Sequence, residues 1–328
     1  MISAYLWKKG DAFKAGISRA DMLGALQQKD SLLWVDLESP TEFESDSLVE
    51  IFNFHPLAVE DCLVDHSQPK ADDYEEYFFI VMHAVMMVHD EEAETDALHT
   101  EELDIFAGKN YIVTFHKTPV RTIAQTREAV LKTPDRYMGH GADMLLHAII
   151  DRLVDNYQPV LDAYDGKIDD LEEDLFSHSG GSDFLSTIVQ VKRDIFNLRR
   201  IVTPQRDTVN FLTRNSSAFI KAKNIMYFRD ICDHLIRIYS IAEGFHESLA
   251  SLLQAYFSYS SQKLNEIIKH MTVLATLTMP SIIVASIYGM NFKHMPELNW
   301  QYGYLFALAL SGGISVTMLV WMKWKKWL

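Results

Sequence analysis

The sequence predicts an α+β domain with a mixed or antiparallel sheet, followed by long helices and a C-terminal pair of membrane-spanning helices. Strand-like and helix-like segments alternate through residues 1–118. Strand signals end near Thr118, and long segments with helical periodicity follow. Residues Met271–Phe292 and Tyr302–Met322 contain no Asp, Glu, Lys or Arg. Each is about 20 residues long, the length that an α-helix needs to cross a bilayer.

The first region carries four segments with the apolar, β-branched and aromatic character of strands: Leu32–Leu37, Tyr77–Val88, Leu103–Phe106 and Tyr111–Phe115. The last two flank Gly108-Lys109-Asn110, which is a hairpin turn signal. Residues 41–52 and 55–64 are predicted to be helices. Thr41 and Glu44 begin the first of these with a capping-box pattern.

Three long helices are predicted after Thr118: residues 142–177, residues 183–213 and a segment from Asn224 to Met290. Ser179-Gly180-Gly181-Ser182 separates the first two, and Pro204 predicts a kink in the second. The third meets no strong breaker before Pro280. Its last third is expected in the membrane, and the rest is expected to stand outside it as a stalk.

The predicted divisions follow these changes in character. They are an α/β domain at 1–118, an acidic helical hairpin at 119–223, a long helix at 224–290 with a first span at about 271–290, a loop at 291–301, a second span at 302–322 and a basic tail at 323–328.

The two apolar segments are predicted to form a membrane hairpin. A buried helical hairpin in a soluble protein is the alternative, but adjacent uncharged segments of spanning length are unusual there. Lys323, Lys325 and Lys326 follow the second span, and basic flanks favour the cytoplasmic side. The turn carries one Lys and one Glu, at Lys293 and Glu297. Two spans return the chain to its starting side, so both termini are expected in the cytoplasm, with no secretory signal.

Composition restricts the function classes. The formal net charge is −15, which argues against nucleic acid as a partner and is compatible with attracting cations. Cys62 and Cys232 lie far apart without CxxC spacing, so neither a zinc site nor a disulfide framework is predicted. No GxxxxGK(S/T) pattern, nucleophile–base pair or metal triad stands out, so no enzyme activity is predicted.

A stripe of residues recurs every three or four positions along the long helix. Its members are Asn265, Ile268, Thr272, Ala275, Met279, Ile282 or Ile283, Ser286 and Met290. Ordinary packing against lipid is one explanation. Self-association around an axis explains better why the stripe mixes Asn, Thr and Ser with apolar residues. An oligomeric bundle is therefore predicted.

Several motifs together resemble the CorA family of divalent metal ion (magnesium) transporters. They are Tyr288-Gly289-Met290-Asn291, Met295-Pro296-Glu297-Leu298, the terminal Lys325-Lys326-Trp327-Leu328, the segment from His55 to Leu63 followed by Gln68-Pro69-Lys70, and Tyr227-Phe228-Arg229-Asp230 with His234. The Gly-Met-Asn tripeptide alone is a weak signal. The likeness covers essentially the whole chain, and the tripeptide together with the Met-Pro-Glu-Leu loop, the two terminal spans and the helix layout is a strong signal.

The resemblance implies a funnel-shaped homopentamer in the cytoplasmic (inner) membrane. Each subunit would have an α/β/α cytoplasmic sandwich, a pair of acidic helices, one long pore helix and one outer span. It implies uptake of Mg²⁺, with Co²⁺ and Ni²⁺ as further ions, driven by the membrane potential and gated by cytosolic Mg²⁺ bound between subunits. The implied partners are further copies of the chain, the lipid bilayer and divalent cations.

The resemblance also assigns roles to residues. The selectivity motif is Gly289, Met290 and Asn291, with Glu297 in the loop. The pore-lining residues are Asn265, Ile268, Met271, Thr272, Thr276 and Met279. The regulatory metal ligands are Glu60, Asp61, Asp151, Asp230 and His234. The tail lysines, Lys323, Lys325 and Lys326, would form a basic collar besides setting topology.

Alternatives remain for these residues. Asn291 suits a helix C-cap, and the regulatory acids suit solvated face charges or salt bridges. Gln254 stands where some family members have an acidic residue, and Ile282 where some have a pore Thr. At the level of function, a Zn²⁺ or Co²⁺/Ni²⁺ transporter of the same architecture is the nearest rival, and Met290 favours the magnesium branch. A membrane-anchored metal sensor that conducts nothing is a rival from another class.

Overall fold

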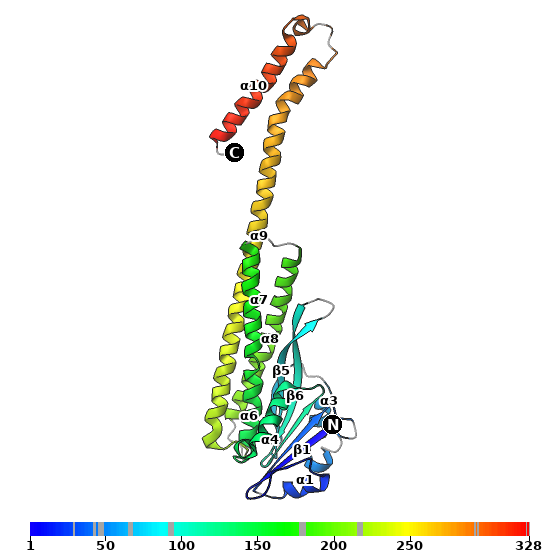
Figure 1. Cartoon of the computed structure of the whole chain (residues 1–328), viewed down its shortest axis with the longest axis vertical. Coiled ribbons are helices and arrows are strands. Elements are labelled where there is room, and N and C mark those ends of the chain that lie inside the picture. Colours follow the sequence, from blue (N-terminus) through cyan, green and yellow to red (C-terminus); the bar gives the residue numbers. More distant parts are fainter. Residues whose placement is uncertain are drawn as a thin grey trace. The chain divides into compact units, whose positions relative to one another are not determined.

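The structure is a computed structural model of the whole chain. It describes residues 1–28, 30–41, 44, 49–64, 68–90, 95–176, 182–214, 219–291, 293, 295–325 and 327. It divides into two compact units, Met1–Leu252 and Leu253–Leu328. Helix α9 (Ile225–Tyr288) contributes to both units (Figure 1).

Within the described residues, a seven-stranded sheet organises the first unit in the order β2-β1-β3-β7-β6-β5-β4. The strands are β1 (Ile2–Lys8), β2 (Lys14–Ala15), β3 (Ser31–Glu38), β4 (Lys70–Asp73), β5 (Phe78–Asp90), β6 (Thr95–Ala107) and β7 (Tyr111–His116). All neighbouring pairs are antiparallel except β3 and β7, which are parallel. The predicted mixed, largely antiparallel sheet is confirmed.

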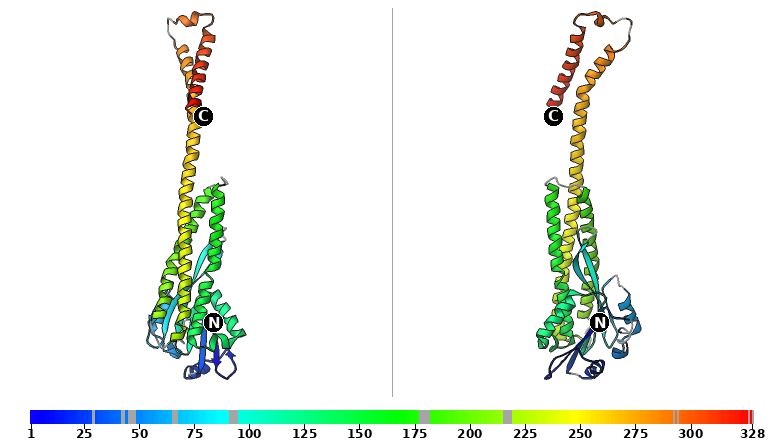
Figure 2. Two further views of the ribbon diagram at one scale, coloured as in Figure 1. Left: turned by 90° about the vertical axis from the view of Figure 1, so that its left-hand side faces the viewer. Right: turned by 45° about the vertical axis from the view of Figure 1, so that its right-hand side comes forward.

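Helices cover both faces of this sheet, so the α/β/α sandwich is confirmed. On one face, α1 (Arg19–Leu26) and α3 (Pro56–Leu63) bury Met22, Ala58 and Val59 in a core shared with β3, β5, β6 and β7. On the other, α6 (Ala142–Asp155), α7 (Gln158–Phe176) and α8 (Ser182–Arg214) pack against β4, β5, β6 and β7. The shorter helices α4 (Arg121–Lys132) and α5 (Pro134–Met138) pack against α6. Figure 2 shows α7 and α8 running side by side.

The predicted capping box is confirmed, although only half of its predicted helix is described. The Thr41 backbone N–H donates to Glu44 Oε2 at 2.9 Å, and the Glu44 N–H donates to Thr41 Oγ1 at 3.3 Å. Residues 42–43 and 45–48 lie outside the described residues, as do 91–94 and 177–181, where a turn between strands and a break between helices are predicted.

The predicted helix over 142–177 is wrong as a single element. The structure has α6 and α7, which are separated at Asn156 and Tyr157. Pro159 is the second residue of α7 and has no N–H to continue the ladder from α6. The Tyr157 N–H instead closes a tight turn onto the Val154 carbonyl at 3.0 Å.

The strand predictions were right in place but incomplete. Strands β1, β2 and β4 were not predicted, and β6 begins at Thr95 rather than Leu103. The polar first half of β6 is held by residue-for-residue pairing with β5, from Phe78↔Ala107 to Asp90↔Thr95. Such cross-strand pairing overrides weak local strand propensity.

The second unit contains the end of α9 and helix α10 (Gly303–Trp324), joined through the short helix η2 (Pro296–Asn299). Both α9 and α10 are long and apolar enough to span a membrane, and only 6% of each apolar window is buried in the chain. A soluble core hairpin would bury such windows, so their exposure favours the membrane over the soluble alternative. Helix α9 begins directly after the short helix η1 (Ala222–Asn224), close to the start predicted at Asn224. Pro280 lies inside α9 and does not end it.

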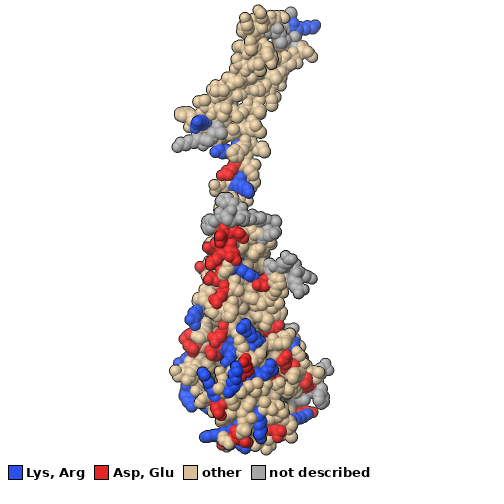
Figure 3. Space-filling view, in the orientation of Figure 1, with Lys and Arg blue, Asp and Glu red and all other residues tan. Residues whose placement is uncertain are grey.

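Acidic residues gather near the C-terminal end of α7 (Figure 3). Its exposed members are Asp169, Asp170, Glu172, Glu173 and Asp174. Ile168, Leu171 and Leu175, which recur every three or four positions along α7, are buried and face the core. These acids therefore form a solvated face of α7.

Candidate ion-contact loop and metal-binding clusters

The Gly-Met-Asn segment lies directly after α9. The backbone N–H of Gly289 donates to the Ala285 carbonyl at 2.9 Å, and that of Met290 donates to the Ile287 carbonyl at 3.2 Å. A Cβ on Gly289 would lie 3.1 Å from the Ala285 oxygen, so any side chain there would crowd the last turn of the helix. Glycine is therefore suited to the tight end of α9.

Asn291 is exposed beyond this turn. Within the described part of the chain, no hydrogen bond joins its side chain to another residue, and the backbone itself closes the helix. The alternative role as a side-chain cap receives no support from this geometry. The amide oxygen remains available to a ligand, and its ion contact stays a prediction.

The loop also contains Lys293 and Glu297, the two charged residues between the spans. Glu297 belongs to η2, but its side chain lies outside the described residues, and the opposing Lys293 is exposed.

The polar and apolar stripe on α9 is largely open in a single chain. Asn265 is exposed, and Ile268 and Met279 are 60% and 62% exposed. The opposite side of α9 faces α10, where Pro280 is buried and Ser315 Oγ donates to the Leu277 carbonyl at 3.0 Å. An uncovered stripe that includes Asn is consistent with the predicted bundle of several chains.

The two threonines of the predicted pore lining have satisfied hydroxyls. Thr272 Oγ1 donates to the Ile268 carbonyl and Thr276 Oγ1 to the Thr272 carbonyl, each at 2.7 Å. Each hydroxyl oxygen can therefore still accept a hydrogen bond from an ion's water. With about 100° per residue, Thr276 and Met271 lie at the two flanks of the stripe rather than at its centre.

Helices α6 and α9 bring together part of the predicted regulatory set. Ligand atoms of Asp151, Asp155 and His234 lie within 4.8 Å of one another. His234 Nε2 also lies 3.8 Å from Asp230 Oδ2. Asp155 was not predicted, although its spacing of four residues from Asp151 places both carboxylates on one face of α6. We call Asp151, Asp155, Asp230 and His234 the α6–α9 cluster.

Burial and neighbouring charges shift the pKa of Asp151 in this cluster. Partial burial raises the pKa of Asp151, with further repulsion from Asp155 and Asp230, while His147 and His234 oppose the shift. Burial lowers the pKa of the neighbouring His147 against the pull of Asp151, Asp230 and Asp155. A divalent cation would relieve the repulsion among these carboxylates.

We expect the stabilisation that Mg²⁺ would give by binding the α6–α9 cluster to weaken as the pH falls from 7.5 toward the raised pKa of Asp151. Because the pKa of Asp151 is raised in the folded protein, its protonated form contributes stability that is lost as the pH rises through this pKa. Mg²⁺ restores stability above that pKa by binding the deprotonated form. Thermal unfolding with and without Mg²⁺ across this range measures the effect. Asp151→Asn should flatten the pH dependence, while Asp169→Asn, on the solvated face of α7, should leave it unchanged.

Glu60 and Asp61 are not part of the α6–α9 cluster within one chain. They lie on α3, which packs into the core on the opposite face of the sheet. Lys70 Nζ donates to Asp61 Oδ2 at 2.6 Å and lies 3.1 Å from Asp72 Oδ2. The salt-bridge alternative therefore holds for Asp61 in the single chain, while Glu60 is exposed.

A buried carboxylate that the sequence did not single out positions the start of α9. Asp143 of α6 is 3% exposed, and its Oδ2 accepts from the Asn224 side chain at 2.8 Å and from the Lys221 backbone at 3.1 Å. Lys221 Nζ also lies 3.4 Å from Asp143 Oδ1. This contact fixes α9 against α6 and thereby sets the approach of Asp230 to Asp151.

A second cluster was missed at the ends of the central strands β3 and β7. Ligand atoms of Asp36, Glu38 and His116 lie within 4.8 Å of one another, although the sequence showed no metal triad. The available sequence signal was that Asp36 and Glu38 are two residues apart on a predicted strand and so share one face. The third residue, His116, is 80 residues from Asp36 in the sequence and comes close to it only through the pairing of β3 with β7.

The basic tail is described only in part. Lys323 and Lys325 are exposed at the end of α10, and Lys326 lies outside the described residues. Their role as a collar is not tested by a single chain.

Comparisons with known proteins agree with this architecture. A family model described as "CorA-like Mg2+ transporter protein" matches residues 29–326. The chain is 37% identical over 279 residues to the cobalt/magnesium transport protein CorA of Thermotoga maritima, covering 85% of this chain and 78% of that one. It is 33% identical over 294 residues to the YfjQ protein of Bacillus subtilis, covering 90% and 89%. The solved CorA magnesium transporter of Methanocaldococcus jannaschii shares the fold, with a TM-score of 0.85 at 19% identity and coverage of 100% and 99%.

Proposed function

The chain belongs to the CorA family of Mg²⁺ transporters, and from this premise we propose that it carries Mg²⁺ into the cytosol through a homopentameric pore. Co²⁺ and Ni²⁺ are proposed as further ions. The observation that carries the proposal is that two exposed apolar helices flank a loop in which Asn291, shortly after the first of them, is exposed and has no side-chain hydrogen bond to the residues that the structure describes. The chain would lie in the inner membrane with both termini in the cytoplasm.

The pore is proposed to be enclosed by five copies of α9. Mg²⁺ holds its water tightly and favours octahedral oxygen coordination, so a selective mouth need not strip the hydration shell. A ring of Asn291 amide oxygens would accept hydrogen bonds from that water. A ring of carboxylates would hold a divalent ion more strongly and slow its release.

The membrane potential is proposed as the driving force. A divalent ion gains roughly 4.6 kcal/mol per 100 mV when it moves to the negative side. This energy needs no nucleotide site. The acidic cytoplasmic unit and the chain's net charge of −15 favour cations near the inner end of the pathway.

Gating is proposed to depend on cytosolic Mg²⁺ held between subunits. The α6–α9 cluster of one subunit would face Glu60 and Asp61 of the next, since α3 cannot bring them to the cluster of its own chain. Unliganded, these carboxylates repel one another, and a bound Mg²⁺ replaces repulsion with bridging attraction. High internal Mg²⁺ would thus hold the pentamer closed.

Liposomes that contain a Mg²⁺ dye test the transport function directly. Reconstituted protein should give Mg²⁺ influx that grows with an imposed inside-negative potential and is blocked by cobalt hexaammine, a mimic of hydrated Mg²⁺. Mass measurement of the detergent-solubilised complex should give five chains. Zn²⁺ influx without Mg²⁺ influx would favour the zinc-transporting alternative, and no influx of any metal would favour the sensor.

Asp230→Ala should shift the protection of the protein by Mg²⁺ against proteolysis to higher Mg²⁺ concentration. Asp230 is exposed in the single chain, with a side-chain exposure of 67%, so the substitution removes a ligand without opening the core. The loss of one carboxylate ligand is expected to weaken Mg²⁺ binding about tenfold, which corresponds to about 1.4 kcal/mol.

Asp170→Ala serves as the control, because it removes an exposed acid from the face of α7. The protection curve of this variant should overlay that of the wild type. If Asp230→Ala gives the same curve as well, Asp230 does not belong to the regulatory site.

A further inference from the structure

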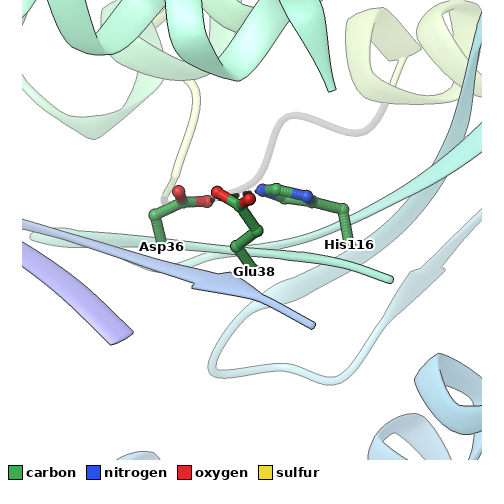
Figure 4. Close-up of side chains that lie close together, drawn as sticks. All are labelled: Asp36, Glu38 and His116. Atoms are coloured by element: carbon green, nitrogen blue, oxygen red, sulfur yellow. Dashed lines mark hydrogen bonds and ion pairs between the residues drawn. The ribbon is translucent and has the colours of Figure 1, made fainter. Parts of the chain in front are cut away.

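Three metal-ligating side chains converge where the parallel strands β3 and β7 end. Asp36 pairs with Thr114, and Glu38 pairs with His116. Alternate residues of a strand share one face, so Asp36, Glu38 and His116 lie on the same side of the sheet. Figure 4 shows their carboxylates and imidazole gathered together on the face covered by helices drawn in green. Asp36 and His116 are 1% and 2% exposed, and Glu38 is partly buried.

The hydrogen bonds of His116 orient its ring. Nδ1 lies 2.6 Å from the Thr118 carbonyl, which can only accept, so Nδ1 carries a proton. In the neutral ring, the lone pair of Nε2 then points toward Asp36 Oδ1 at 3.2 Å. Two acceptors at this distance repel each other unless a positive species lies between them. That species is either a second proton on His116 or a metal ion.

Asp36 distinguishes between these two species. Its Oδ1 accepts from Thr114 Oγ1 at 2.6 Å, and Trp34 Nε1 donates to the same hydroxyl at 3.1 Å. Its Oδ2 is buried and has no hydrogen-bond partner among the residues that the structure describes. Burying a carboxylate oxygen without a partner is unfavourable, and a proton on His116 reaches Oδ1 alone. Glu38 adds a second carboxylate, so the cluster has more negative charge than one imidazolium can neutralise.

We propose that Asp36, Glu38 and His116 bind a divalent transition-metal ion of the Zn²⁺ or Co²⁺ type. At a metal–ligand distance of about 2.1 Å, ligand atoms at the tetrahedral angle of about 109° lie about 3.4 Å from each other, close to the 3.2 Å between Nε2 and Oδ1. Imidazole suits Zn²⁺ and Co²⁺, whereas Mg²⁺ favours oxygen ligands. The Thr118 carbonyl and the Thr114 hydroxyl would orient the ligands from the second layer.

This site shares no residue with the α6–α9 cluster or with the proposed pore lining. A bound ion would link the ends of β3 and β7 and so stabilise the cytoplasmic unit. Asp36 and His116 are 80 residues apart in the sequence. A cavity of about 400 Å³ has His116 and Thr118 in its lining, whereas Asp36 and Glu38 do not line it.

Binding of Co²⁺ by the chelator-treated full-length protein in excess Mg²⁺ tests the proposal. Mg²⁺ fills the oxygen-ligand sites, so the wild type should retain one Co²⁺ per chain with the visible absorption bands of a nitrogen-ligated ion. His116→Gln and Asp36→Asn should each weaken this binding by at least about tenfold. Glu38→Gln should do the same, and it is the safer variant because the Glu38 carboxylate makes no hydrogen bond to the described residues.

His234→Gln is the matched control, because the α6–α9 cluster also contains a histidine. This variant should keep the absorption bands and the affinity of the wild type. Loss of the bands in His234→Gln, with His116 intact, would assign the ion to the other cluster and overturn the proposal. It is also overturned if the wild type retains no Co²⁺ in excess Mg²⁺, or if Glu38→Gln binds Co²⁺ as tightly as the wild type. Failure of the wild type to retain Co²⁺ would identify the cluster as a buried imidazolium–carboxylate pair.

Discussion

Asn291→Ala is expected to reduce Mg²⁺ influx about 100-fold or more, with little change in the stability of the protein. Asn291 is exposed, and its side chain makes no hydrogen bond within the described residues, so the folded chain loses no internal contact. In a pentamer the substitution removes five amide groups at once. If each hydrogen bond to the water of the ion contributes about 0.5–1 kcal/mol, the ring contributes several kcal/mol to holding the ion at the mouth. A factor of 100 requires only about 2.7 kcal/mol.

The test compares influx into liposomes under an imposed potential with the thermal stability of the same preparations. Asn299→Ala is the matched control, because it removes an exposed Asn from the neighbouring helix η2. The control should conduct like the wild type. Influx through Asn291→Ala within a few-fold of the wild type would show that the amide ring does not select the ion. Equal loss in both variants would point to a general disturbance of the loop.

The fold could be predicted where local signals and tertiary structure agree. Strand β3 and the hairpin of β6 and β7 carry strong local strand and turn signals, and the structure confirms them. The polar half of β6 could not be found from local sequence, because its stability comes from pairing with β5. The break between α6 and α7 was within reach, since Pro159 marks it, but the periodicity of the apolar residues continues across it.

The candidate sites were predictable to different degrees. The motif at Gly289 is continuous in sequence, and the structure places it directly after α9, where the apolar pattern ends. The predicted regulatory set coincides with the α6–α9 cluster only in part. Asp155 was missed although its spacing from Asp151 signals it, and Glu60 and Asp61 lie on the opposite face of the sheet within one chain. His116 and Asp36 meet through strand pairing, a relation that no local pattern in one sequence contains.

Met279→Asn is expected to raise Mg²⁺ influx at high internal Mg²⁺, the condition in which the proposed gating would close the wild type. Met279 lies on the open stripe of α9, with 62% exposure in the single chain. Around the axis of a pentamer, Met279 and Ile268 would form apolar rings, and a narrow apolar ring blocks ions because water leaves it. A ring of five amides keeps water in the constriction. Lowering the barrier by about 1.4–2.8 kcal/mol would raise the influx about 10- to 100-fold.

Met271→Asn provides the comparison that separates a pore effect from a general effect of polarity in the membrane. Met271 has a similar exposure of 65%, but the helical period places it at the flank of the stripe. Its substitution should therefore raise the influx less than that of Met279. Both variants should be measured with the same internal Mg²⁺, and cobalt hexaammine should still block them, because the mouth at Asn291 is unchanged. A larger leak through Met271→Asn would mean that α9 presents a different face to the axis, since side chains on one helix cannot exchange places without rotation of the whole helix. Unchanged influx in both variants would exclude an apolar constriction at this level of α9.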